Sequence, residues 1–158
     1  MCEYCDYLAL LTDAGLDPTE NRQRVLEVIG GNNTPLTAAE VHATLARTKA
    51  INRVTVYRIL ELLVQHRLLD KINGGRAAHY GLAPNQNHAP HPHFCCSQCG
   101  TMVCLNPDSL SVDAANLQRS YAGTIERIEV LVEGVCKTCL KTRHHHAHQG
   151  APGRAAGP

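Results

Sequence analysis

The spacing of apolar residues predicts helices through the first part of the chain. Helical segments begin near Tyr7, Pro18, Thr37 and Asn52. The third start is the clearest, because Thr37 and Glu40 have the capping-box spacing, in which both side chains satisfy free amides of the first turn. In the fourth segment, Asn52 is the expected cap of a helix with an i, i+3, i+4, i+7 apolar stripe. The stripe consists of Val56, Ile59, Leu60 and Leu63.

A turn signal predicts a β-hairpin after these helices. Residues 68–72 and 77–80 flank Asn73-Gly74-Gly75, and Asn-Gly accepts the positive φ angles of a tight turn. Helix, short connection, helix and hairpin is the order of a winged helix-turn-helix domain, whose second helix enters the DNA major groove. The alternative is an ordinary helical core with a hairpin attached.

Prolines indicate a domain boundary after the hairpin. Pro84, Pro90 and Pro92 interrupt any regular pattern at 83–92. The expected division is a winged-helix DNA-binding domain at 1–84, a hinge at 85–92, a second domain at 93–140 and a disordered histidine-rich tail at 141–158.

The second domain is expected to combine short strands with one helix. The pattern predicts strands at 94–96 and 102–105, a helix at 107–121, and a strand buried on one face at 125–132. The expected fold class is therefore α+β, with a helical winged domain followed by a small α/β domain.

Composition agrees with two small domains and adds a local positive charge. The 158 residues contain 4% aromatics and no tryptophan, which is little for one large core. Between Arg47 and Arg76 there are seven basic residues against two acidic ones, and such an excess attracts a phosphate backbone unless it is merely a solvated helix face. No leader or membrane-spanning run is evident, so we expect a cytoplasmic protein without membrane contact.

The cysteines are spaced as metal ligands. Cys96 and Cys99 form one Cys-x-x-Cys pair, and Cys136 and Cys139 form another. In a reducing compartment such pairs favour a closed, tetrahedral zinc site over disulfides, and a zinc ion with no open position is architectural rather than catalytic. Cys95 competes with Cys96, but only Cys96 has the two-residue spacing.

Histidines beside the first pair offer a second, adjustable metal site, which suggests a metal sensor. The run comprises His88, His91 and His93. No activated nucleophile, and no open metal position with a general base, is recognisable, so an enzyme is not expected; a thiol oxidoreductase is the remaining enzymatic alternative. The purpose of the Cys2 and Cys5 pair, and of the histidines in the tail, stays open.

Motifs in three places resemble the ferric uptake regulator (Fur) superfamily over roughly residues 8–140. Residues 54–60, Val-Thr-Val-Tyr-Arg-Ile-Leu, resemble its recognition-helix signature. Residues 91–100, His-Pro-His-Phe-Cys-Cys-Ser-Gln-Cys-Gly, resemble its hinge motif, and Cys136-x-x-Cys139 resembles its closing knuckle.

The resemblance implies a homodimeric, metal-responsive transcriptional regulator, usually a repressor, that binds double-stranded DNA at a palindromic operator. The second domain would then be the dimerisation domain, with one structural Zn²⁺ held by Cys96, Cys99, Cys136 and Cys139. Base contacts are expected from Tyr57 and Arg58, and phosphate contacts from Arg53, Thr55 and Arg76.

The resemblance also implies a regulatory metal at the hinge. His91 and His93 fall on the two motif histidines, and Cys104 stands where relatives place a carboxylate ligand. A thiolate there softens the site and favours Zn²⁺ over oxygen-loving ions. The fourth ligand is expected to be Asp70, which matches an aspartate of some zinc-sensing members, with His79 as the alternative.

Two departures from the family pattern bear on the metal that is sensed. Gly81 replaces an acid, and Pro35 replaces a histidine, that iron and peroxide sensors use. The expected function is therefore that of the zinc uptake regulator branch, a zinc-dependent repressor of metal-uptake genes. The alternatives are an iron- or peroxide-sensing member with Fe²⁺ or Mn²⁺ as the regulatory ion, or, in another class, a zinc carrier or thiol redox protein.

Overall fold

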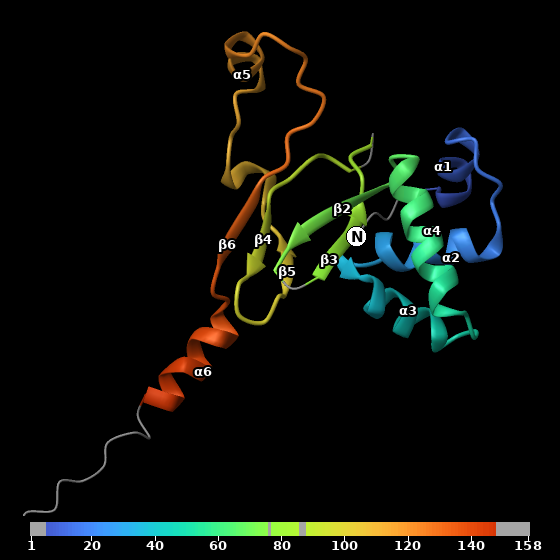
Figure 1. Ribbon diagram of the computed structural model, residues 1–158, viewed down its shortest axis with the longest axis horizontal. Helices are drawn as coiled ribbons and strands as arrows, with labels where there is room; N and C mark the ends of the chain where they lie inside the picture. Colours follow the sequence, from blue (N-terminus) through green and yellow to red (C-terminus); the bar gives the residue numbers. More distant parts are fainter. Residues whose placement is uncertain (1–5, 76, 86–87, 148–158) are drawn as a thin grey trace, which may run out of the picture.

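Four helices enclose the main apolar core of the computed structural model, which describes residues 6–75, 77–85 and 88–147. They are α1 (Tyr7–Asp13), α2 (Glu20–Gly30), α3 (Ala38–Ala46) and α4 (Arg53–Gln65) (Figure 1). The predicted caps are confirmed. Thr37 and Glu40 form the capping box at the start of α3, and the side chain of Asn52 accepts a hydrogen bond from the Val54 amide at 2.8 Å.

The apolar stripe of α4 holds this helix in the core. Val56, Leu60 and Leu63 are completely buried, and they belong to one cluster with side chains of α2 and α3. Burial of each such side chain contributes about 1.5–3 kcal/mol, so the stripe fixes which face of α4 points outward. On that outward face, Tyr57 and Arg58 are exposed.

A three-stranded antiparallel sheet completes the winged helix. Its strands are β1 (Leu36–Thr37), β2 (Leu69–Gly74) and β3 (Ala77–Leu82), in the order β1-β3-β2. β2 and β3 form the predicted hairpin, with Asp70 opposite Gly81. The predicted Asn73-Gly74 turn is wrong in position, because both residues pair within β2, opposite Ala78 and Ala77, and the positive φ of 65° is at Gly75. The predicted winged helix-turn-helix is thus confirmed.

A second three-stranded sheet forms the centre of the C-terminal part. Its strands are β4 (His93–Cys96), β5 (Met102–Cys104) and β6 (Leu131–Gly134). β4 lies between the other two, antiparallel to β5 and parallel to β6. The predicted strand at 125–132 is wrong in extent, because pairing with the four-residue β4 begins only at Leu131.

The apolar alternation that suggested this strand belongs to an exposed surface instead. The side chains of Ile128 and Val132 are 39% and 41% exposed, so the expectation of a face buried within the chain is wrong. Alternation reports an apolar face, but not whether the same chain covers it.

The expected helix at 107–121 is divided into two. A 3-10 turn at Pro107–Ser109 and helix α5 (Ala114–Ser120) replace it. Asn106 and Asp113 each accept a hydrogen bond from a backbone amide ahead of them, so each side chain starts a new helical segment.

The expected start of the tail is wrong, because helix α6 (Lys137–Ala147) extends beyond it. Disorder was predicted from Lys141, but the helix continues to Ala147 and projects from the rest of the molecule (Figure 1). The second cysteine pair lies at the start of this helix, where the Leu140 amide donates to the Cys136 carbonyl at 3.0 Å. Once the first turn has formed, each further residue adds a hydrogen bond at little cost. Residues 148–158 of the predicted tail lie outside the described residues.

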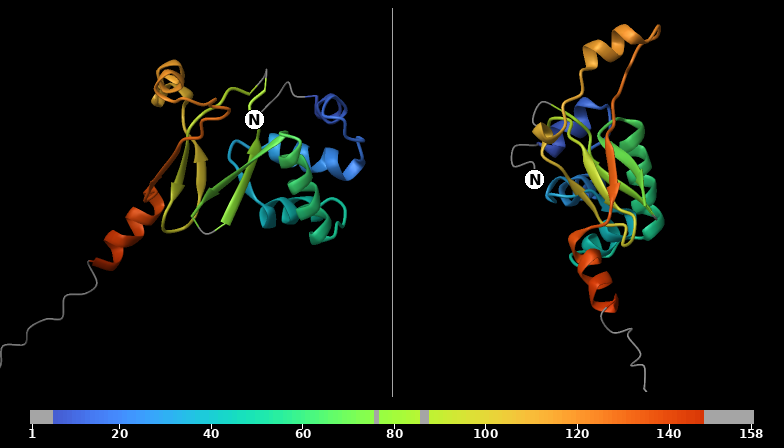
Figure 2. Two further views of the ribbon diagram at one scale, coloured as in Figure 1. Left: turned by 45° about the horizontal axis from the view of Figure 1, so that its top comes forward. Right: turned by 90° about the vertical axis from the view of Figure 1, so that its left-hand side faces the viewer.

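The tip of the hairpin packs against the second sheet (Figure 2). Ile72, Cys95 and Met102 form a small second core, with Leu131 beside it. A Cβ atom built on Gly75 would lie 3.1 Å from the Cys95 sulfur, and φ is positive there, so a larger residue would strain this turn. Within the described residues, no helix is long and apolar enough to cross a membrane.

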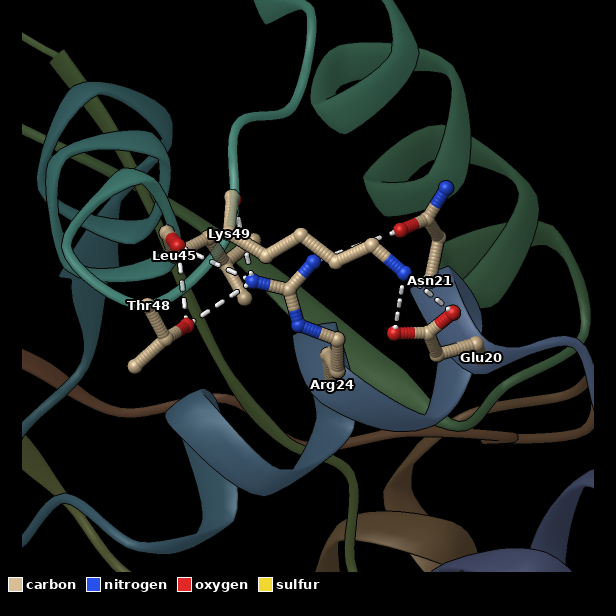
Figure 3. Close-up of polar contacts among 6 residues, drawn as sticks. All are labelled: Glu20, Asn21, Arg24, Leu45, Thr48 and Lys49. Carbon is tan, nitrogen blue, oxygen red and sulfur yellow. Dashed lines mark hydrogen bonds and ion pairs between the residues drawn. The ribbon is translucent and has the colours of Figure 1, made fainter.

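Arg24 of α2 ties the end of α3 to the segment that leads into α4 (Figure 3). Its Nη2 atom donates to the Leu45 carbonyl at 2.9 Å, the Thr48 hydroxyl at 2.9 Å and the Lys49 carbonyl at 3.2 Å. The guanidinium therefore places a positive charge at the C-terminal end of α3, where helix carbonyls lack partners.

Replacing Arg24 with methionine should destabilise the winged domain, because the carbonyls of Leu45 and Lys49 and the Thr48 hydroxyl each lose a hydrogen bond from the guanidinium. We expect the free energy of unfolding in urea to fall by about 1–3 kcal/mol. Arg22→Met is the matched control, since Arg22 donates to the Asp17 carbonyl and lies outside the α3–α4 connection. Equal losses in the two variants would contradict a special role for Arg24.

Candidate metal centres and DNA-binding face

The pairing of β4 with β6 brings the two cysteine pairs together. Parallel pairing sets Cys96 beside Gly134, so Cys136 follows just beyond the strand end. The sulfur atoms all lie within 4.8 Å of one another, and they belong to Cys96, Cys99, Cys136 and Cys139. This arrangement can hold one metal ion.

Hydrogen bonds from backbone amides favour the thiolate form of Cys96, which is the form that binds a cation. The Cys136 amide donates to the Cys96 sulfur at 3.3 Å. Hydrogen bonds from the backbone amides of Cys99 and then Cys136 lower the pKa of Cys96 to about 6, which favours the thiolate. Sharing of a proton with the sulfurs of Cys136 and Cys99 raises the pKa of Cys139 to about 12. A bound metal ion takes the place of such protons, so the donor chemistry fits a metal thiolate site.

Cys95 lies apart from the cluster. Successive residues of a strand point to opposite faces, so Cys95 faces the hairpin while Cys96 faces the other cysteines. Burial is the main cause of the raised pKa of Cys95, which favours the neutral thiol. The side chain serves as a small apolar residue in the second core.

A second group of donors lies at the hinge. The ligand atoms of His91, His93 and Cys104 lie within 4.8 Å of one another. The antiparallel register of β4 and β5 sets His93 directly opposite Cys104, and His91 precedes β4 by two residues.

His91 is oriented as a metal ligand. Its Nδ1 atom lies 3.0 Å from the Ala89 carbonyl oxygen, so Nδ1 carries the proton and Nε2 has the free lone pair. That Nε2 atom is buried and has no hydrogen-bond partner within the described part of the chain. Buried polar atoms are rarely left without a partner, and an ion at this place would satisfy this one.

Two of the hinge imidazoles, His88 and His93, favour the neutral form. Burial, and then the neighbouring His91 and His88, lowers the pKa of His93 to about 4. Burial also lowers the pKa of His88. Neutral imidazole is the ligating form, so at neutral pH no proton has to leave His93 before an ion binds.

Asp70 faces the same cavity but is held by another residue. The cavity is lined by Asp70, His88, His91, His93 and Cys104, among others. The Asp70 carboxylate forms an ion pair with Arg127 at 2.9 Å. Burial raises the pKa of Asp70, and the Arg127 guanidinium opposes this rise. Asp70 is therefore near the hinge donors without belonging to their close group.

The structure does not bring His79 to the hinge. It shares a face of the hairpin with Asp70, but it pairs with Ile72, two residues further along β2. Two strand residues span roughly 7 Å. The His79 Nδ1 atom is 3.1 Å from the Ala77 carbonyl oxygen, and the ring lines a separate cavity beside Cys99.

Two residues near the hinge were not among the expected ligands. His88 lies in the histidine run, and its ring centroid is 5.0 Å from that of His91, so the run itself was a signal. Arg127 gave no signal, because only folding brings it to Asp70.

The outward face of α4 carries three of the residues predicted to contact DNA, Arg53, Tyr57 and Arg58. Arg53 and Arg58 are exposed, and the Arg53 guanidinium lies 5.6 Å from the Tyr57 ring centroid. Thr55 is partly buried on the same helix. Arg76, like Cys2 and Cys5, lies outside the described residues.

Residues 13–133 match the model of the Ferric uptake regulator family. The chain belongs to this family. A Ferric uptake regulation protein of Bacillus subtilis (strain 168) is 29% identical over 124 residues, which is 77% of this chain and 83% of the relative. Membership makes the chain a metal-responsive transcription regulator rather than an enzyme.

Solved structures of the family share this fold. The Vibrio cholerae ferric uptake regulator superposes with a TM-score of 0.67 at 23% identity, covering 83% of this chain and all of the other. A zinc uptake regulator complexed with zinc and DNA gives a TM-score of 0.59 at 17% identity, covering 86% of this chain and 91% of the other. At these identities the likeness concerns the fold alone.

Cys139→Ser should remove one tightly held metal ion per chain, because a tetrahedral thiolate site loses a ligand. We expect the metal content of purified protein, measured by mass spectrometry, to fall by one equivalent. Cys95→Ala is the control, and it should keep that ion. Unchanged metal content in Cys139→Ser would rule out the four-cysteine site.

Proposed function

We propose that this regulator is a zinc-dependent repressor of metal-uptake genes that acts in the cytoplasm as a homodimer. In this proposal Cys96, Cys99, Cys136 and Cys139 hold a structural Zn²⁺. A regulatory Zn²⁺ binds at the hinge through His91, His93 and Cys104, with Asp70 as fourth ligand. The domain division is the one expected above, except that the C-terminal part continues as helix to Ala147.

The observation that carries this proposal is the buried His91 Nε2 atom, which has no hydrogen-bond partner among the residues that the structure describes. It faces a group with one further imidazole and one thiol, and an ion there would satisfy it. His79 is left out of the proposed ligand set because it lines a different cavity.

The donor set supports zinc over iron or manganese. Nitrogen and sulfur donors suit Zn²⁺, whereas Mn²⁺ prefers carboxylates and carbonyl oxygens. Family members similar to this chain are described both as ferric uptake and as zinc uptake regulators, so the choice rests on Cys104.

The hinge donors come from parts of the chain that need not move together. His93 and Cys104 belong to the second sheet, His91 to the hinge, and Asp70 to the wing strand β2. An ion bound to all of these donors stabilises the conformation in which they lie close together. The size of this effect is set by how much more tightly the ion binds that conformation than a conformation in which the donors are apart. The orientation of α4 relative to the second sheet then depends on zinc.

Exposed apolar side chains of the C-terminal part support the homodimer. Leu110, Leu117, Ile128 and Val132 are each 39–46% exposed. A second copy of the chain would cover such a surface and present two α4 helices related by twofold symmetry, which suits a palindromic operator. In each copy Tyr57 and Arg58 would contact bases, and Arg53, Thr55 and Arg76 would contact phosphates.

His93→Ala and Cys104→Ser should abolish zinc-dependent DNA binding while the fold and the four-cysteine site persist. A gel shift on the operator of the protein's own gene, with and without zinc, measures this. His66→Gln is the control, because His66 lies at the end of α4, away from the hinge. A normal zinc response in both variants would contradict the regulatory site, and zinc-independent DNA binding by the unaltered chain would contradict the sensor.

Arg58→Ala should relax sequence preference, because a bidentate contact to a base is worth about 1–3 kcal/mol. Affinities for the operator and for single-base variants of it, at fixed salt, give the discrimination directly. Arg119→Ala in α5 removes the same charge far from α4 and should leave the discrimination intact. An equal loss of affinity for all sequences would indicate that Arg58 contacts a phosphate rather than a base.

A further inference from the structure

The Asp70–Arg127 ion pair joins the wing to the second domain. Asp70 lies on β2, and Arg127 lies in the segment that leads into β6. Among the ion pairs of the described residues, this one alone links the winged helix to the C-terminal part. The Asp70 side chain is only 20% exposed, so solvent screens the pair less than it would screen a surface pair.

The same carboxylate is the proposed fourth ligand of the regulatory metal. It faces the cavity of His91, His93 and Cys104, yet it does not belong to the close group that these three form. Arg127 binds the Asp70 Oδ1 atom through Nη1 at 2.9 Å. A guanidinium and a metal ion are both cations, and each uses the carboxylate lone pairs.

Arg127 also has a second acidic partner. Its Nη2 atom lies 3.1 Å from a carboxylate oxygen of Glu129. If Asp70 turned toward the hinge, Arg127 would therefore keep a counter-charge. The exchange leaves no unpaired guanidinium, which lowers its cost.

We propose that Arg127 competes with the regulatory metal for Asp70 and thereby sets the zinc concentration at which the protein responds. Without hinge metal, the guanidinium supplies the positive charge that holds the wing strand to the second domain. When an ion binds, Asp70 leaves Arg127 for the ion, and Glu129 retains Arg127. This inference rests on the proposed hinge site and adds to it a residue that tunes its affinity.

Zinc affinity of Arg127→Gln tests the competition. Four proteins are titrated with zinc against a chelating indicator: the unaltered chain, Arg127→Gln, Asp70→Asn and the double variant. Each protein keeps the metal bound by the four cysteines. Loss of the competitor should tighten hinge binding by roughly two- to fivefold, the factor expected for an ion pair of ordinary strength. Asp70→Asn should weaken binding, and adding Arg127→Gln to it should bring no recovery.

The double variant separates competition from a general charge effect. If Arg127 merely repelled the cation, its removal would tighten binding with Asn at position 70 as well, and that result would overturn the proposal. Arg119→Gln removes one positive charge elsewhere in the same domain and should not change the affinity. Unchanged or weaker binding by Arg127→Gln would also overturn it, since Arg127 would then have no effect or would orient Asp70 as a ligand.

Hydrogen exchange in the absence of hinge metal gives a second readout. Amides of β2 should exchange faster in Arg127→Gln than in Arg119→Gln, because the wing loses its link to the second domain. Equal exchange would overturn this part of the proposal. His93→Ala distinguishes failure of this inference from failure of the proposed hinge site. If His93→Ala abolishes zinc binding at the hinge while Arg127→Gln has no effect, only the role of Arg127 is wrong. If the unaltered chain binds no zinc at the hinge, the hinge site itself is wrong.

Discussion

The backbone pairing of β4 with its two neighbours is the constraint on which both candidate metal centres depend. Antiparallel pairing with β5 sets His93 opposite Cys104. Parallel pairing with β6 sets Cys96 beside Gly134, next to the second cysteine pair. One four-residue strand therefore contributes a donor to each centre, at its opposite ends. A shift in its register would disrupt both, because a slip by one residue turns every side chain of a strand to the other face.

The two centres differ in what they connect. The four cysteines come from the end of β4, the turn after it, and the start of α6 beyond β6, so an ion there would stabilise one folded unit. The hinge donors face a cavity that the wing strand also lines, so an ion there would act between units. This difference explains how similar ligand chemistry can be architectural in one place and regulatory in the other. The Asp70–Arg127 pair and the small core of Ile72, Cys95 and Met102 already join these units without an ion.

Much of the winged domain was predictable because its signals are local. A capping box, an asparagine cap and an apolar stripe each act within a few residues, and each occurs where it was expected. The glycine turn was also signalled locally, but it begins at Gly75 rather than at Asn73-Gly74, which pair within β2. The C-terminal part was predicted less well. The expected helix at 107–121 is divided by two side-chain caps, the expected strand at 125–132 is mostly irregular, and the chain remains helical from Lys141 to Ala147. In that part the apolar side chains form an exposed surface, and contacts within one chain do not account for their pattern.

The sequence by itself determined the donor types and their spacing. Two Cys-x-x-Cys pairs and an interrupted histidine run indicate metal binding before any fold is known, because these residue types are the ligands that zinc uses. Only the tertiary structure decided which of them converge. It left His91 Nε2 without a hydrogen-bond partner in the described part of the chain, separated His79 from the hinge, and paired Arg127 with Asp70. Those relations depend on distances between segments far apart in the chain, and the spacing of residues along a sequence does not contain them.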